Sequence, residues 1–171
     1  MAGFGGLGSA MADFDAEEFP LVARGHRFED FTVGQVFAHH WGRTLTAGDN
    51  ALFCTATCHW VPMYLNAEFA RAHGHPDVVL SPMLVLCTVV GLSVEDLSEA
   101  SGPFLGVEDC TFHRPLFPGD TVTARSTVVQ TRPSASRPDA GVVSWFTEAH
   151  DQRGELVLDF LRTNLLARRT P

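Results

Sequence analysis

One apolar segment, residues 78–94, constrains the fold of this chain more than any other feature. It contains the run SPMLVLCTVVGL, in which Ser81 is a good helix cap and Pro82 takes the first helical position, where its missing N–H costs nothing. The predicted helix is apolar nearly all round, which indicates burial inside a domain. It is shorter than the roughly 20 mostly apolar residues that cross a bilayer. We therefore expect a buried central helix and no membrane association.

Four strand-like segments rich in Val, Thr and Phe follow this helix, at residues 104–117, 121–130, 141–150 and 155–168. They are separated by PGD, by TRPSASRPDA and by DQRG, and the first and last of these are typical of tight turns. Strands joined by such turns are antiparallel. With a further strand expected at 36–44, the chain is predicted to be an α+β protein, a curved antiparallel sheet wrapped around one central helix.

A helix is predicted to begin at Ala47, because Thr46 and Asp49 have the spacing of a capping box. Pro62 is expected to end this segment. Helical spacing would turn three apolar side chains inward: Leu52, Phe53 and Ala56. A second, short helix is expected between the cap Asn66 and the terminating Gly74.

The length of 171 residues and the hydrophobic fraction of 45% suit a single domain. Residues 1–22 are rich in glycine and alanine and then acidic, so we expect a flexible tail rather than a secretory signal, with the domain at 23–171. The net charge of −8 argues against nucleic-acid binding. All 12 cations are arginine, so arginines, helix N-termini or backbone amides would have to hold any anionic ligand.

Four scattered cysteines form no C-x-x-C pair. Cys54 and Cys58 are four residues apart on the predicted helix and would share one face, but a zinc site needs two further ligands at suitable spacing. We predict no metal and a reducing, cytoplasmic location.

In this order and spacing, several segments resemble the MaoC-like family of hot-dog proteins, which includes the (R)-specific enoyl-CoA hydratases. They are RTLTAGDNALF, PMYLNAEFA, VVLSPML, FHRPLFPGDTV, RPDAGVVSW and DQRGELVL, and the last three look closest to the mesaconyl-CoA hydratases. The resemblance spans residues 28–168 and implies a hot-dog fold, an acyl thioester of coenzyme A or of acyl-carrier protein as substrate, and a homodimer. It implies no cofactor.

In the hydratases of this family, an aspartate and a histidine five residues later form the acid–base pair. His59 and Tyr64 stand at these two positions here, with the spacing of five kept and both identities changed. A histidine can act as a general base near neutrality, and a tyrosine serves as an acid or hydrogen-bond donor. The pair could therefore keep acid–base chemistry with reassigned roles, or the pocket could survive without the reaction.

The family also places a histidine–glycine pair at the start of the central helix, where N–H groups hold the thioester oxygen. Ser81 and Pro82 occupy these positions, so an oxyanion donor would be the Ser81 hydroxyl, the Met83 N–H or another amide. Trp60 and Asn66 are further candidates for lining the substrate pocket.

Two functions follow from the resemblance. The first is an acyl-thioester hydratase or dehydratase that uses His59 and Tyr64. The second is a repurposed hot-dog protein that binds an acyl or hydrophobic ligand, or catalyses thioester hydrolysis, isomerisation or cyclisation. Arg132 and Arg137, beside the long predicted loop, are candidates for the phosphates of coenzyme A or of a carrier arm.

Overall fold

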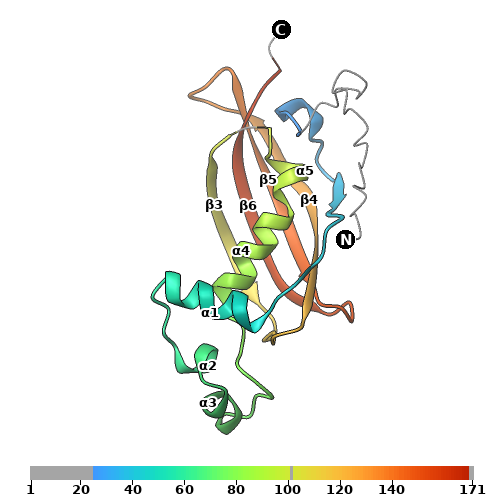
Figure 1. The fold of residues 1–171 in the computed structure, drawn as a ribbon. Coiled ribbons are helices and arrows are strands. Elements are labelled where there is room, and N and C mark those ends of the chain that lie inside the picture. Colours follow the sequence, from blue (N-terminus) through green and yellow to red (C-terminus); the bar gives the residue numbers. More distant parts are fainter. Residues whose placement is uncertain (1–24, 101, 170–171) are drawn as a thin grey trace, which may run out of the picture.

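The fold is a six-stranded antiparallel sheet wrapped around a helix, in a computed structural model that describes residues 25–100 and 102–169 (Figure 1). The predicted tail at 1–22 lies outside the described residues. The strand order is β1-β4-β5-β6-β3, and β2 pairs with β4. The strands are β1 (Val36–Ala38), β2 (Arg43–Thr44), β3 (Phe104–Phe112), β4 (Thr121–Pro133), β5 (Ala140–His150) and β6 (Leu156–Ala167).

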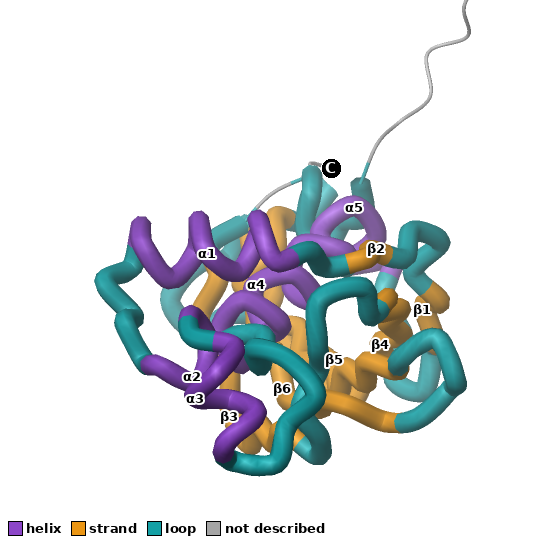
Figure 2. Tube along the Cα trace, turned by 60° about the horizontal axis from the view of Figure 1, so that its bottom comes forward, coloured by secondary structure: helices purple, strands orange, loops and turns teal. Residues whose placement is uncertain are grey.

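The central helix α4 (Pro82–Leu92) runs across the concave side of this sheet, and in an end-on view the strands curve around it (Figure 2). Its buried side chains pack against residues of the sheet and of the segment before β4, and this cluster is the main core. The cluster includes Leu84, Val85, Val89, Leu116, Val122, Leu158 and Phe160. The predicted α+β architecture and the four long strands are confirmed.

The strand expected at 36–44 is interrupted. Ala38 pairs with Arg125 and Arg43 pairs with Val122, so the four residues 39–42 lie opposite only two residues of β4. The two extra residues interrupt the hydrogen-bonded pairing with β4, so the expected strand is divided into β1 and β2. Within the break, His39 is buried and contacts Asp96 and Ser126 through its two ring nitrogens, at 2.6 Å and 2.9 Å.

The helix α1 (Ala47–Ala56) begins as predicted, with Thr46 and Asp49 forming the capping box. Its expected inward face is wrong: Leu52 is 73% exposed and Ala56 is also exposed, whereas Phe53 is half-buried against the core. Asn50 and Cys54 are the buried side chains instead. Hydrogen bonds made by the Asn50 amide hold this face of α1 in place of an apolar stripe.

Pro62 does not end α1, which stops at Ala56; it begins the short helix α2 (Pro62–Leu65) instead. The next helix, α3 (Ala67–Ala72), is capped by the Asn66 side chain, which accepts from the Phe69 N–H, as predicted. The 3-10 helix η2 (Phe28–Asp30) precedes β1, and α5 (Val94–Leu97) follows α4.

The prediction that α4 is buried on all sides is wrong for one face in this chain. Met83 is 45% exposed, Cys87 and Gly91 are exposed, and Val94 just beyond the helix is 38% exposed. The sheet covers only one side of the helix, which leaves an apolar stripe open. Within the described part of the chain, every helix falls short of the length and apolar character needed to cross a membrane.

Candidate active site at the start of the central helix

The turn after α1 places His59 beside the first residues of α4. Cys58 adopts a left-handed backbone conformation, with φ of 55°, which is uncommon for a residue other than glycine. The His59 N–H then donates to the Cys54 carbonyl at 2.8 Å. This tight turn fixes the position of the half-buried His59 ring at the end of α1.

His59 and Tyr64 are in aromatic contact at this end of α4. Their ring centroids are 5.1 Å apart and their planes meet at 66°, an edge-to-face arrangement. His59 Nδ1 also lies 3.3 Å from the Ser81 hydroxyl oxygen. The structure therefore brings together three of the residues that the sequence singled out, with Met83 beside His59 in the same cavity.

Ser81 is fully buried, and its side chain makes no capping hydrogen bond to α4. Because Pro82 has no N–H, the unpaired amides at the start of the helix begin at Met83. The Val85 N–H already donates to the Ser81 carbonyl. A ligand oxygen at this end of α4 could therefore accept from the Met83 N–H or from the Ser81 hydroxyl.

Asn50 fixes the positions of Ser81 and Tyr64 relative to α1, and the sequence interpretation missed this residue. Its side-chain oxygen accepts from the Ser81 N–H at 2.8 Å, and its amide nitrogen donates to the Tyr64 carbonyl at 2.8 Å and to the Val79 carbonyl at 3.3 Å. The residue is 1% exposed. The available signal was its spacing of four from Cys54, which would place one buried polar side chain on the same helix face.

Burial raises the pKa of the Tyr64 phenol above its ordinary value, with a smaller contribution from the neighbouring Cys54. Burial also raises the pKa of the Cys54 thiol. Tyr64 thus keeps its proton through the neutral range and can donate a hydrogen bond or a proton. His59, an imidazole, is the group in contact with it that can accept one.

Two open cavities lie at this end of α4. His59 lines one of about 350 Å³ together with Phe53, Thr57, Cys58 and Met83. Tyr64 lines another of about 360 Å³, whose walls include His75, Pro82, His113 and Arg114. One ring of the pair therefore lines each cavity, His59 the first and Tyr64 the second.

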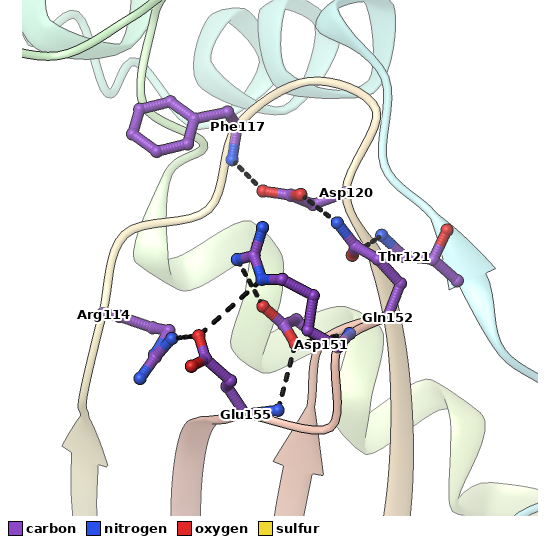
Figure 3. Close-up of polar contacts among 8 residues, drawn as sticks. Arg114, Phe117, Asp120, Thr121, Asp151, Gln152 and Glu155 are labelled. Atoms are coloured by element: carbon purple, nitrogen blue, oxygen red, sulfur yellow. Dashed lines mark hydrogen bonds and ion pairs between the residues drawn. The ribbon is translucent and has the colours of Figure 1, made fainter.

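Part of the wall of the second cavity comes from the loop after β3, and polar contacts tie that loop to the β5–β6 turn (Figure 3). Gln152 donates to the Asp120 carboxylate at 2.7 Å and accepts from the Thr121 N–H at 3.0 Å. Arg114 forms an ion pair with Glu155. These contacts link the FHRPLFPGDTV and DQRGELVL segments and so fix the position of the cavity wall.

Four predicted site residues lie elsewhere. Trp60 is 68% exposed and lines neither cavity. The Asn66 side chain is used as the cap of α3. Arg132 and Arg137 lie at the end of β4 and in the β4–β5 loop, at the opposite end of the sheet from α1 and α2 (Figure 1), and Arg137 pairs with Asp139 at 3.1 Å. Their role with phosphates stays a prediction.

Cys54 and Cys58 do not share a helix face, because α1 ends between them, with Cys54 buried and Cys58 exposed. In residues 25–100 and 102–169, no group of three or more His, Cys, Asp and Glu side chains is arranged to hold a metal ion.

Comparison with known proteins places this chain in a family. The sequence matches the mesaconyl-CoA hydratase family over residues 16–171. A mesaconyl-CoA hydratase of Haloarcula marismortui is 40% identical over 149 residues, which cover 86% of this chain and 42% of that protein. The chain thus spans less than half the length of the curated mesaconyl-CoA hydratases of Haloarcula that it matches.

Solved structures agree with this placement. A structure described as a MaoC domain protein dehydratase from Chloroflexus aurantiacus has a TM-score of 0.81 and 31% identity, over 86% of this chain and 42% of that one. A Mycobacterium tuberculosis protein described as a double hotdog fold has a TM-score of 0.75 and 28% identity, over 86% of this chain and 46% of that one. The predicted MaoC-like resemblance is confirmed, and this chain, a hot-dog protein, belongs to the mesaconyl-CoA hydratase family.

Proposed function

We propose that this chain acts as a hydratase or dehydratase on an acyl thioester of coenzyme A or of acyl-carrier protein. The observation that carries the proposal is the edge-to-face pair of His59 and Tyr64 beside Ser81, at the start of α4. An imidazole and a protonated phenol in contact supply the base and the acid that water addition and removal require. The names of the relatives, mesaconyl-CoA hydratase and β-methylmalyl-CoA dehydratase, support this class of reaction.

In the dehydration direction, His59 takes the proton from carbon 2 of a 3-hydroxyacyl thioester. The electron pair of that C–H bond forms the carbon–carbon double bond, and the bond from carbon 3 to oxygen breaks. Tyr64 gives its proton to the departing oxygen, which leaves as water, and the proton held by His59 returns to the phenolate. Hydration reverses these steps.

Charge develops on the thioester oxygen when carbon 2 loses its proton. The Met83 N–H and the Ser81 hydroxyl are the donors that could stabilise it, helped by the positive end of the α4 dipole. Because Pro82 removes one donor, this stabilisation rests on fewer amides than a helix start without proline would offer.

The second candidate is a hot-dog unit that binds the acyl group, or catalyses another step on it, without lyase chemistry. Two observations favour it: both acid–base positions differ from those of the family's hydratases, and Pro82 lies at the oxyanion position. In that case His59 and Tyr64 fill the site without transferring protons, and thioesters bind without turnover.

We also propose that the chain pairs as a homodimer. The edge strand β3 carries the exposed side chains Phe104, Leu105 and Phe112, and α4 leaves an apolar stripe uncovered beside it. Exposed edges of this kind pair readily with another strand. The mesaconyl-CoA hydratase of Haloarcula marismortui is more than twice as long as the stretch that it shares with this chain, and one solved structure is described as a double hotdog fold. A second copy of this chain would supply a comparable second unit.

Sedimentation or light scattering tests the pairing. The wild type should be dimeric and Leu105→Lys should be monomeric, because a lysine on the edge strand opposes pairing. Val33→Lys is the matched control, since Val33 is 58% exposed and lies outside the sheet. A monomeric wild type would contradict the proposal.

We keep the cytoplasmic location as a prediction, which the free state of Cys54, Cys58, Cys87 and Cys110 supports.

The reaction is tested by incubating the protein with enoyl- and 3-hydroxyacyl-CoA thioesters, mesaconyl-CoA among them, and following the absorbance of the conjugated double bond. We expect turnover of at least one substrate and its loss in His59→Ala. Binding of the same thioesters by calorimetry, without turnover, would instead establish the second candidate.

A further inference from the structure

One histidine on the wall of the Tyr64 cavity has no part in the reaction described so far. His75 is half-buried and lines the cavity of about 360 Å³ together with Tyr64. Across residues 25–100 and 102–169, no group forms a hydrogen bond or ion pair with its ring nitrogens. Phe112, on another wall, belongs to the β3 edge assigned above to the second copy, whereas Tyr64 and His75 belong neither to that edge nor to the open stripe of α4.

The turn after α3 fixes the position of His75. Gly74 follows this helix in a left-handed conformation, with φ of 87°, and the His75 N–H donates to the Ala70 carbonyl at 3.1 Å. The imidazole lies against the ring of Phe117, with the centroids 5.9 Å apart and the planes at 47°. Phe117 belongs to the loop after β3 that is tied to the β5–β6 turn (Figure 3). The fold therefore supports both the backbone and the ring of His75.

The two other basic side chains of this cavity already have acidic partners. His113 Nε2 lies 2.8 Å from an oxygen of Asp159, and Arg114 forms an ion pair with Glu155. In the described part of the chain, no acidic side chain lines the cavity. His75 is thus the basic group of this wall that can exchange a proton, and imidazole is the side chain that takes up and releases protons near neutral pH.

The proposed reaction, on which a role for His75 rests, leaves a phenolate on Tyr64 and a proton on His59 after each dehydration. The two rings meet edge to face, and among the described contacts no hydrogen bond joins them. His59 Nδ1 lies beside the Ser81 hydroxyl instead. Burial raises the pKa of the Tyr64 phenol, so its phenolate takes a proton readily from a donor within reach. The return of a proton to Tyr64 therefore needs an intermediary.

We propose that His75 is the proton shuttle of Tyr64. In the dehydration direction, the His75 imidazolium gives its proton through a water molecule to the Tyr64 phenolate, and solvent then protonates His75 again. His59 releases the proton of carbon 2 to solvent, so one proton leaves the site and one enters it in each turnover. Hydration reverses both transfers. His75 acts through Tyr64 and does not contact the substrate.

Turnover of the best thioester substrate by His75→Gln tests the shuttle on the full chain. In weakly buffered solution we expect kcat to fall at least about tenfold with KM nearly unchanged, because His75 takes no part in substrate binding. Imidazole added to the solution should restore most of the loss, since it can protonate the phenolate in place of the side chain. His73→Gln is the matched control, because His73 is exposed and its Nδ1 lies 2.8 Å from the Phe69 carbonyl oxygen. This control should keep the wild-type rate with and without imidazole.

A double variant separates a shuttle from a structural role. Because the shuttle serves only the phenol, adding His75→Gln to Tyr64→Phe should cause no further loss of kcat. A further loss in the double variant, a loss in His75→Gln that imidazole does not restore, or a wild-type kcat in His75→Gln would each overturn the shuttle. Any of these results with an active wild type would leave the proposed function standing, whereas no turnover by the wild type would overturn both proposals.

Discussion

The side-chain oxygen of Asn50 accepts the N–H of Ser81 at 2.8 Å, and this contact joins α1 to the start of the central helix. The other end of the same amide donates to the carbonyl of Tyr64. One buried side chain thus sets the spacing between the residue that would donate a proton and the residue beside the thioester oxygen.

Asn50→Ala should therefore lower the free energy of unfolding by about 2–4 kcal/mol, because it leaves a buried N–H and two carbonyls unpaired. Urea denaturation measures the change. The matched control is Asn66→Ala, which removes the exposed cap of α3 and should cost about 1 kcal/mol. Equal losses of unfolding free energy in the two variants would show that the hydrogen bonds of Asn50 stabilise the fold no more than an exposed helix cap does.

The left-handed conformation of Cys58 predicts an unusual order of stabilities. A non-glycine residue in this region costs roughly 1–2 kcal/mol, and β-branched residues tolerate it least. Cys58→Gly should be as stable as the wild type or slightly more so, since the released strain is offset by the greater freedom of glycine in the unfolded chain. Cys58→Val should have a lower melting temperature. Equal melting temperatures for the two variants would contradict this account of the turn.

Tyr64 is the only tyrosine in the chain, so its ionisation can be followed directly by phenolate absorbance. Burial raises its pKa above the ordinary value near 10. A raised pKa in the folded state means that the protonated phenol favours folding, and this contribution is lost as the pH rises through the folded pKa. We expect the titration midpoint of the native protein above pH 10 and that of the urea-unfolded chain near 10. A native midpoint at or below 10 would show that the phenol is not buried as described.

The sequence predicted the architecture well where local patterns and tertiary packing agree. The apolar run at 78–94 and the four strand-like segments correspond to α4 and β3–β6, and the Thr46–Asp49 capping box begins α1. The open stripe of Met83, Cys87 and Gly91 could not be foreseen. An apolar helix has the same sequence pattern whether its own sheet covers it on one side or on all sides.

Asn50 and Arg162 show where such patterns fail. Asn50 lies on another face of α1 than the one expected to turn inward, and the identity of its three hydrogen-bond partners depends on the tertiary fold. Arg162 occupies the inward phase of β6, between the buried Phe160 and Leu166. A charge within the apolar alternation was a visible signal, but the Ser93 and Ser98 hydroxyls that accept from it follow α4 in the chain, and their approach to β6 depends on the tertiary fold.

The most direct test of the account is the turnover of the best thioester substrate by Tyr64→Phe compared with the wild type. This change removes only the hydroxyl, so the ring contact with His59 at 5.1 Å can remain. Trp60→Phe, which alters an exposed ring outside the cavities, is the control and should leave turnover unchanged. We predict a loss of at least about 100-fold in Tyr64→Phe, the usual contribution of a positioned acid. Turnover by Tyr64→Phe at the wild-type rate would contradict the proposal that His59 and Tyr64 act as the acid–base pair.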